Sequence, residues 1–455
     1  MSSDHVNDPP PITPDHGAPP RRDLSRRALL AGAATAASGV AISALPDLLT
    51  GQPSAKKAAA KATASLNAAG PAMSAVTPAL VIPDDPTRVL GLPTSAQSIR
   101  SPFENPSRTP VGLVSGSSLT PIHQLTGTIT PIDLQFERHH GGVALIDPAK
   151  YRLLVHGLVK RPTMFTLDDL KALPSVTRVH FLECSGNGRV GYKSPKPDTT
   201  PQQIDGLLSN AEWTGVPLKT VLAEAGGMTS DAKWALAEGG DAALLSRSIP
   251  VAKLLDDALL VYAANGEALR PAAGYPVRLL LPGWEGNTNV KWLRRLELIR
   301  EPNMSKDETS KYTDPLPNGT ARQFSFEIDA KSTLTSPTFP SRIARKGWVQ
   351  LSGIAWSGRG RITAVDVSTD GGQSWVQAEI QGTPQPKALV RFVSLWKWEG
   401  QPALLMSRAV DETGYMQPTV DVFRAGRGPG TDYHYNHIRG WQVASDGQVT
   451  YGVPT

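Results

Sequence analysis

Cysteine is nearly absent from this sequence, because Cys184 is the only one in 455 residues. A single cysteine cannot form a disulfide within the chain, so disulfide bonds do not hold this fold together. No C-x-x-C pair and no H-E-x-x-H motif occurs, which excludes the common zinc sites, and no C-x-x-C-H motif occurs to attach a haem. Any haem that serves this protein must therefore belong to another chain.

Aromatic and charged residues are also sparse, at 6% and 19% of the chain. The formal net charge of +5 is small, so the composition gives little support to nucleic-acid or membrane-surface binding. Glycine and proline, by contrast, are abundant, with 41 and 40 residues. These numbers favour a strand-rich and loop-rich body over a helical bundle, and the length predicts two folded domains plus tails.

Apolar runs of membrane-spanning length are absent after residue 45. Before it, Arg26 and Arg27 precede a weakly apolar, alanine-rich stretch at 28–45, which is the layout of a twin-arginine export signal. A transmembrane anchor is the alternative, but the stretch is short and weakly apolar for one. We therefore expect an export signal at 1–45, a flexible linker at 46–100 and a periplasmic or other extracytoplasmic location. Because this pathway carries folded proteins, it also favours a cofactor.

The stretch around Cys184, "VTRVHFLECSGNGR", runs from a predicted strand into a loop of small residues. Such a cysteine can be a small buried hydrophobe, half of an intermolecular disulfide, or a ligand or nucleophile whose thiolate needs nearby positive charge. The glycines allow the backbone to turn sharply and to approach a bound group, and Arg189 follows closely. We favour the third interpretation, a thiolate for a soft metal carried by an anionic cofactor.

Several segments together resemble the sulfite oxidase family of molybdenum enzymes, in the family's order across roughly residues 120 to 450. They are "FERHHGGVALIDPAKYRLLVHGLV", "HFLECSGNGR", "GYPVRLLLPGWEGNTNVKWLRRLEL", "GIAWSGRGRITAVDVSTDGGQSW", "RAVDETGYMQP" and "NHIRGW". Within the family, "FERHH", "PGWEGNTNVKW" and "ETSKYTDPLPNGTARQFSF" are most similar to the SoxC branch, the molybdenum subunits of sulfite or sulfane dehydrogenase complexes.

The resemblance implies an α+β protein with a molybdenum–molybdopterin cofactor whose metal is bound by Cys184. It implies a mixed α/β molybdopterin-binding catalytic domain, placed at 101–320, and an immunoglobulin-like β-sandwich dimerisation domain at 321–455. It further implies a homodimer and a c-type cytochrome, as a companion subunit, that accepts the electrons. No nucleic-acid partner is expected.

The residues themselves support this order of elements. Thr166 and Asp169 form a capping-box pattern, and "VPLKTVLAEAG" begins with proline and ends at glycine, so both predict helices among strands. From residue 345 onward apolar and polar residues alternate, as at 349–352 and 365–368, and Asp-Gly-Gly at 370–372 predicts a hairpin turn. This pattern is typical of a β-sandwich, and taken alone it also fits a carbohydrate-binding or adhesive module.

The resemblance also assigns catalytic residues. Arginine holds small anions well, and Arg138, Arg189 and Arg439 fall on the family's substrate-pocket positions, although a single arginine is more often a surface charge or a salt-bridge partner. Tyr312 matches the active-site tyrosine, and its alternative role is packing under a loop. With the ligand Cys184, these four complete the predicted catalytic set.

Cofactor contacts are carried over in the same way. The predicted cofactor-binding residues are Phe136, Glu137, Arg138, His139, His140, Cys184, Asp241, Arg278, Asn289, Val290 and Lys291. Arg278 and Lys291 would neutralise the cofactor's phosphate. Two positions depart from the animal members, which carry asparagine at His139 and a cofactor-contacting histidine at Ala273.

The function that the resemblance implies is oxidation of sulfite, or of a sulfane sulfur bound to a carrier, by oxygen-atom transfer. The sequence leaves these two substrates open. Alternatives are a molybdopterin reductase of the methionine sulfoxide type and a non-catalytic exported binding module, which would hold no molybdenum. A nitrate reductase is less favoured, because such enzymes are normally fused to haem and flavin domains.

Overall fold

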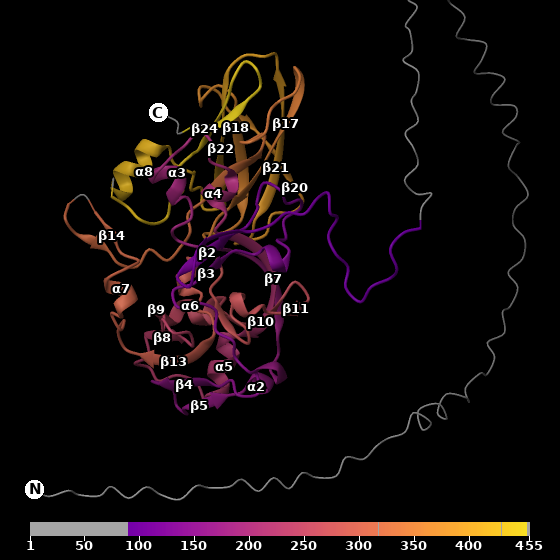
Figure 1. Cartoon of the computed structure of the whole chain (residues 1–455). Helices are drawn as coiled ribbons and strands as arrows, with labels where there is room; N and C mark the ends of the chain where they lie inside the picture. The colour runs from indigo at the N-terminus through magenta and orange to yellow at the C-terminus, as the bar shows by residue number, and fades with distance from the viewer. Residues whose placement is uncertain (1–89, 317, 429, 453–455) are drawn as a thin grey trace, which may run out of the picture. The chain divides into compact units, whose positions relative to one another are not determined.

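The computed structural model describes residues 90–452 apart from 317 and 429, and one compact unit begins at Ser95 (Figure 1). The predicted export signal and most of the predicted linker lie outside the described residues. None of the helices in the described part of the chain is long and apolar enough to cross a membrane.

Two five-stranded sheets build the first half of this unit. One has the order β5-β4-β13-β8-β9, in which β13 runs parallel to β4 and the other pairs are antiparallel. The second has the order β11-β10-β7-β6, with β12 also paired to β10. Their bounds are β4 Leu153–Gly157, β5 Thr163–Phe165, β6 Val176–Glu183, β7 Leu208–Pro217, β8 Trp234–Gly239, β9 Ser246–Pro250, β10 Leu259–Ala264, β11 Glu267–Ala268, β12 Arg278–Leu280 and β13 Leu293–Ile299.

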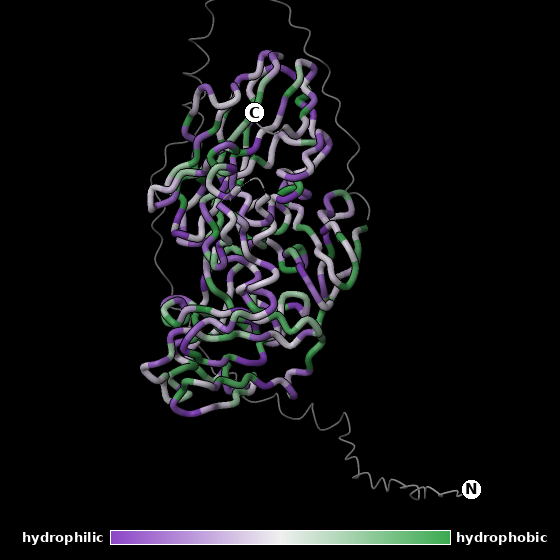
Figure 2. The backbone as a smooth tube through the Cα atoms, turned by 90° about the vertical axis from the view of Figure 1, so that its left-hand side faces the viewer, coloured by the Kyte–Doolittle hydropathy of each residue, from purple (hydrophilic) through white to green (hydrophobic). Residues whose placement is uncertain are grey.

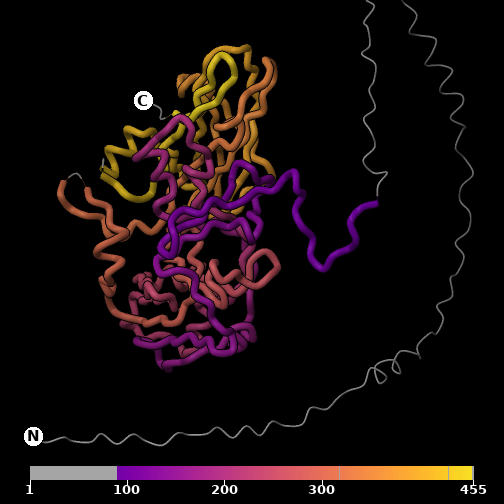
Figure 3. The backbone as a smooth tube through the Cα atoms, in the orientation of Figure 1, coloured from indigo at the N-terminus to yellow at the C-terminus, as the bar shows by residue number. Residues whose placement is uncertain are grey.

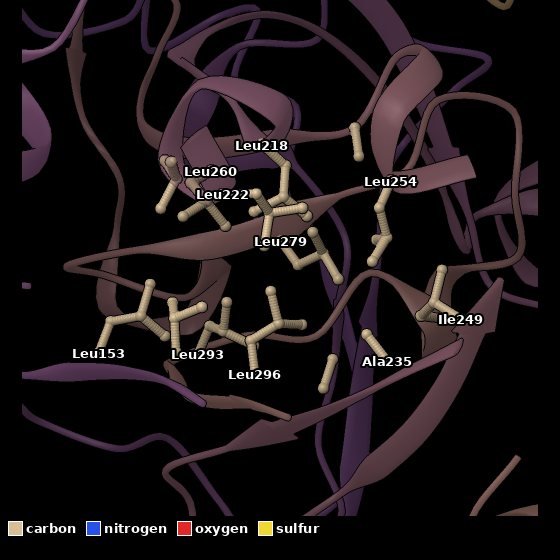
Figure 4. Packing of buried hydrophobic residues seen from close by; sticks show 14 of the residues in the cluster. Leu153, Leu218, Leu222, Ala235, Ile249, Leu254, Leu260, Leu279, Leu293 and Leu296 are labelled. Carbon is tan, nitrogen blue, oxygen red and sulfur yellow. The ribbon is translucent and has the colours of Figure 1, made fainter. Parts of the chain in front are cut away.

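Short helices lie between these strands. They are η2 Ile132–Leu134, α2 Leu167–Ala172, α3 Arg189–Lys193, α4 Pro201–Asp205, α5 Leu218–Glu224, α6 Val251–Asp256, η3 Pro271–Ala273, η4 Gly286–Thr288 and α7 Lys306–Thr309. Figure 4 shows leucines of α5, β10 and β12 facing leucines of β4 and β13 in one buried cluster. Burial of this apolar surface fixes the two sheets against each other and so fixes the loops at their ends.

The second half is an antiparallel two-sheet sandwich, as predicted. One sheet has the order β16-β17-β21-β20 and the other β19-β18-β22-β23-β24. The strands are β16 Lys331–Ser336, β17 Gly347–Trp356, β18 Ile362–Ser368, β19 Val376–Gln377, β20 Glu379–Gln381, β21 Val390–Trp398, β22 Ala403–Asp411, β23 Gly440–Val443 and β24 Val449–Gly452, with helix α8 at Val420–Arg427. Figure 2 shows hydrophobic stretches in both halves, in line with their separate buried clusters.

The chain before β4 contacts both halves. After the sheet of β1 (Thr109–Gly112), β2 (Gly116–Leu119) and β3 (Glu137–Arg138), the loop between β2 and β3 contacts β7 and β21. The Thr130 amide donates to the Asn210 carbonyl at 2.8 Å, and Arg391 donates to the carbonyls of Leu125 and Gly127. Figure 3 shows this segment in indigo across the middle of the unit. A last small sheet joins β14 (Asp314–Pro315) to β15 (Ala321–Arg322).

The local predictions from the sequence are confirmed. Thr166 and Asp169 form the capping box of α2, and α5 begins directly after Pro217. The alternating stretch at 349–352 lies in β17, and the Asp-Gly-Gly sequence turns the chain from β18 toward β19, with both glycines at positive φ. The domain boundary near residue 320 stays a prediction.

Candidate functional site

Cys184 directly follows strand β6, as the sequence predicted, and lies partly buried in a tight loop. Its amide donates to the Leu207 carbonyl at 3.0 Å, and its carbonyl accepts from the Asn187 amide at 2.9 Å. A Cβ atom on Gly286 would lie 3.3 Å from the Cα of Cys184, so a glycine there lets a second loop approach closely. The sulfur is therefore held between two backbone segments.

One pocket gathers most of the predicted residues around this sulfur. Its lining includes Phe136, Glu137, Arg138, His139, His140, Cys184, Asp241, Arg278, Asn289, Val290, Lys291 and Tyr312. They come from β3 and the residues on either side of it, from the position after β6, from the loop after β8, from β12, from the segment after η4, and from the chain after α7. Segments up to 176 residues apart in sequence thus meet at one place.

Three cations in this pocket, Arg138, Arg278 and Lys291, have no carboxylate ion-pair partner among the described residues. Arg278 is buried, donates to the carbonyls of Ala273 and Asn289 at 2.9 and 3.0 Å, and leaves its Nε without a partner. The Lys291 ammonium contacts Nδ1 of His139 at 2.8 Å and donates to the Arg138 carbonyl at 3.1 Å. Burial lowers the pKa of Arg278 to about 9 and the pKa of Lys291 well below its usual value. Such uncompensated cations favour an anionic ligand.

The segment after β2 supplies the pocket's remaining polar wall. The pKa of Glu137 falls to about 2, chiefly through its 3.0 Å hydrogen bond with His139 and also through Arg108. This bond and the contact with Lys291 together fix the His139 ring. Arg138 is half-buried and donates to the carbonyls of Gly116 and His139, which orients its guanidinium in the pocket wall.

Tyr312 lies beside the residues that follow β3. Its hydroxyl is 3.2 Å from Nε2 of His140, and its amide donates to the Tyr433 hydroxyl at 3.2 Å. Burial raises the pKa of Tyr312, and burial together with Arg138 lowers the pKa of His140. A neutral phenol beside a neutral imidazole can donate or pass a proton.

Two predicted substrate residues are not in this lining. Arg189 is 47% exposed and pairs with Asp432 at 3.3 Å. Arg439 is buried, with its Nη1 3.1 Å from an Asp205 oxygen and its Nη2 donating to the Tyr435 carbonyl at 2.9 Å. Their role in substrate binding stays a prediction, and in this structure both occupy ion pairs.

The pKa of the Cys184 thiol differs from what the sequence led us to expect. A thiolate needs nearby positive charge to stabilise it, and Arg138 does lower the pKa of Cys184. Burial outweighs this effect, so the pKa is raised overall. A metal ion bound to the sulfur would itself displace the proton, because a coordinating thiol is deprotonated.

Sequence reasoning did not single out several lining residues. Trp213 lies under the Arg278 guanidinium, whose carbon is 5.5 Å from the ring centre, and the Ser209 hydroxyl accepts from the Phe136 amide at 2.9 Å. Asn287 lies inside the quoted segment "PGWEGNTNVKW" but was not chosen. Trp213 and Ser209 lie on β7 and belong to no recognisable motif. The pairing of β7 with β6 brings them to the pocket.

Comparison with known proteins gives the family. Residues 140–306 match the family model of the oxidoreductase molybdopterin binding domain, and residues 322–440 match the Mo-co oxidoreductase dimerisation domain. Sulfite oxidase from Gallus gallus is 31% identical over 314 residues, which cover 64% of this chain and 68% of that protein. The chain belongs to the sulfite oxidase family. Mitochondrial sulfite oxidase from Mus musculus is 33% identical over 315 residues, and the match covers 64% of this chain but only 58% of the mouse protein's length.

Two further relatives show which proteins this chain is similar to within and beyond the sulfite oxidases. The solved structure of the sulfane dehydrogenase SoxCD from Paracoccus pantotrophus is 46% identical, with a TM-score of 0.77 over 80% of this chain and 96% of that one. An NADH nitrate reductase from Ulva prolifera is 30% identical over 338 residues, and the match covers 65% of this chain and 38% of that protein. The predicted family, its SoxC branch and the two-part fold are confirmed.

The family's cofactor, molybdenum bound by molybdopterin, fits the residues of this pocket. Cys184 offers a soft sulfur ligand, and the Nε of Arg278 is a buried donor without a partner in the protein. Arg278 and Lys291 offer charge to a phosphate, and Ala273, which replaces the histidine of animal members, gives its carbonyl to Arg278. This bond uses the backbone carbonyl, so it does not depend on the side chain at position 273.

Gly188, at the start of α3, is expected to be intolerant of a side chain. Its φ is +94°, and a Cβ there would lie 2.3 Å from Nη2 of Arg439. We expect Gly188→Ala to lower the unfolding free energy by about 2 kcal/mol more than Gly266→Ala. Gly266 has a φ of +81° with nothing near its missing Cβ, so it reports the backbone cost alone. Urea unfolding measures both, and equal losses would show that the Arg439 contact does not matter.

Proposed function

We propose that this protein oxidises an anionic sulfur compound, sulfite or a carrier-bound sulfane sulfur, and passes the electrons to a c-type cytochrome. The observation that carries the proposal is the pocket itself, in which the single cysteine and Tyr312 meet three cations that have no carboxylate partner among the described residues, Arg138, Arg278 and Lys291. The bound molybdenum cofactor would supply the oxygen-atom transfer and hold the two electrons.

In this proposal the chain's own residues bind and orient. Cys184 holds the metal, and Arg278 and Lys291 hold the cofactor's phosphate. Arg138 attracts the anionic substrate and orients its sulfur, since its guanidinium is fixed by two backbone carbonyls. Tyr312 and His140, joined by a hydrogen bond, donate a hydrogen bond to the bound anion and move a proton when product leaves.

We further propose the protein's assembly and location. The match of residues 322–440 to a dimerisation domain supports a homodimer, and a SoxCD relative supports a companion cytochrome subunit. The paired Arg26 and Arg27 support twin-arginine export to the periplasm or another extracytoplasmic compartment. N-terminal sequencing of exported protein tests this last point, and an unprocessed Arg26-Arg27 pair on the mature chain would contradict cleavage.

The experiment that tests the activity supplies candidate substrates to cofactor-loaded protein and follows cytochrome c reduction. Sulfite and a persulfide formed on a carrier-protein cysteine are the two donors, and their rates identify the preferred substrate. In the reverse direction, methionine sulfoxide and nitrate are offered with a reduced viologen dye. The proposal expects electrons from a sulfur donor. Turnover of methionine sulfoxide or nitrate alone would replace it with a reductase function.

A further inference from the structure

Arg247 of β9 is a buried arginine beside the pocket, and no motif marks it. Its side chain is fully buried. Nη1 donates to the Asn287 side chain, Nη2 lies 3.3 Å from a Glu285 oxygen, and Nε is 3.7 Å from a Glu308 oxygen without a hydrogen bond. An arginine held between two buried carboxylates has a fixed place.

The guanidinium lies against Tyr312. Its central carbon is 5.0 Å from the centre of the phenol ring, a cation–π distance. Tyr312 is held in a left-handed backbone conformation, with φ of +51°. A bulky residue adopts that conformation only where its surroundings enforce it.

Glu308 anchors the segment that leads to Tyr312. It lies on α7, four residues before the tyrosine, and accepts from the hydroxyl of Ser248 and from the amide of Ser305, each at 3.0 Å. Because Ser248 is next to Arg247 on β9, this strand holds both the tyrosine ring and the chain that carries it.

The same arginine reaches the cysteine loop through Asn287. The Asn287 side chain accepts from Arg247 and donates to the Ser185 hydroxyl at 3.2 Å. Ser185 follows Cys184, so one guanidinium connects the metal-ligand loop with the tyrosine.

We propose that Arg247 is a positioning residue that fixes the Tyr312 ring in the pocket and sets its position relative to the Cys184 loop. It acts through the tyrosine and contacts neither substrate nor cofactor. The structural part of the inference stands without turnover, and only its effect on rate rests on the proposed function.

The first test is ¹⁹F NMR of protein labelled with 3-fluorotyrosine, read without cofactor. The chain has nine tyrosines, and the Tyr312 resonance is identified by its loss in Tyr312→Phe. Arg247→Lys keeps the charge but loses the planar fork, so we expect this resonance to shift or broaden. The matched control is Arg408→Lys, because Arg408 stacks on Trp375 at 4.3 Å and pairs with Asp366 in the sandwich. That variant should leave Tyr312 unchanged.

If Arg247→Lys does not fold, Asn287→Ala gives the reading for the link to the cysteine loop, since it removes the side chain that accepts from Arg247 and leaves the Glu308 anchor of α7 in place. An unchanged Tyr312 resonance in a folded variant would overturn the inference. A change in the resonance supports it even if no sulfur compound is oxidised, so failure of the proposed function remains distinguishable.

The second test is a double-mutant cycle on kcat with the preferred sulfur donor. We expect Arg247→Lys to lower kcat by about 10- to 100-fold in the native background, with molybdenum content unchanged. In the Tyr312→Phe background the same substitution should have little further effect. Equal losses in both backgrounds would mean that Arg247 acts through general structure and not through Tyr312.

Discussion

Cys184→Ser is expected to lower the rate of sulfur oxidation by more than about 100-fold. Loss of a residue that only orients a metal ligand usually costs about 10- to 100-fold in metal affinity or activity, and loss of the ligand itself should cost more. Serine is nearly the same size, but its hydroxyl is a harder ligand that stays protonated at neutral pH, so it cannot replace a thiolate. Molybdenum content by mass spectrometry and donor-dependent cytochrome reduction measure the effect.

Folding provides the control for this substitution. Cys184 forms no disulfide, so the cofactor-free variant should melt close to the cofactor-free native chain. A parallel loss of folding would make the kinetic result uninformative about ligation, whereas a well-folded variant without activity isolates it. Full molybdenum content with full activity in Cys184→Ser would show that the thiol is not the ligand.

Lys291→Met is expected to act in opposite directions on the cofactor-bound and cofactor-free protein. In the presence of cofactor it removes a phosphate partner, so cofactor retention should fall by about 10- to 100-fold. In the absence of cofactor the substitution removes a half-buried charge that has no carboxylate partner among the described residues. The unfolding free energy of the cofactor-free protein should therefore rise.

The pH dependence of stability follows from the same lysine. In the unfolded chain Lys291 holds its proton up to about its ordinary pKa of 10.5, whereas burial lowers its pKa in the folded, cofactor-free protein. Between these two values the unfolded state binds more protons, so the unfolding free energy rises with pH, by at most about 1.4 kcal/mol per pH unit for one proton. Below both values the charged lysine is an unfavourable contribution. Lys291→Met should remove the share of this slope that Lys291 contributes, which urea unfolding of the cofactor-free proteins from pH 7 to 9 measures. Above about pH 9 Arg278, whose pKa burial lowers to about 9, adds a slope of the same sign.

Lys253→Met is the matched control for Lys291→Met. Lys253 is also buried beside a tryptophan, at 5.2 Å from the Trp284 ring, but it pairs with Asp257 at 2.6 Å and does not line the pocket. Its removal should destabilise the chain by weakening the pairing of Asp257, which keeps Lys387 at 2.6 Å, and it should leave cofactor retention unchanged. Equal cofactor loss in both variants would mean that Lys291 supports the fold and not the phosphate.

Residues inside continuous motifs could be predicted from the sequence. Cys184 after a strand, the capping box at Thr166 and the alternation at 349–352 each depend on neighbours within a few positions, and the structure places them as expected. Lys291 lies in a motif as well, and its pocket position agrees.

Residues whose role depends on distant partners could not be predicted in the same way. Nothing near Arg439 in sequence indicates that Asp205 neutralises it, and nothing near Arg247 indicates that it stacks on Tyr312. Both relations arise only when segments far apart in the chain pack together. The burial that raises the pKa of Cys184 is a tertiary effect of the same kind.

Molybdenum content per chain, measured on native protein produced in a host that makes the cofactor, decides whether this pocket holds the cofactor. We predict about one molybdenum atom for each chain, released together with the pterin on denaturation. Purified protein that is folded but contains no molybdenum under these conditions would contradict this prediction and would favour a binding module built on the same fold.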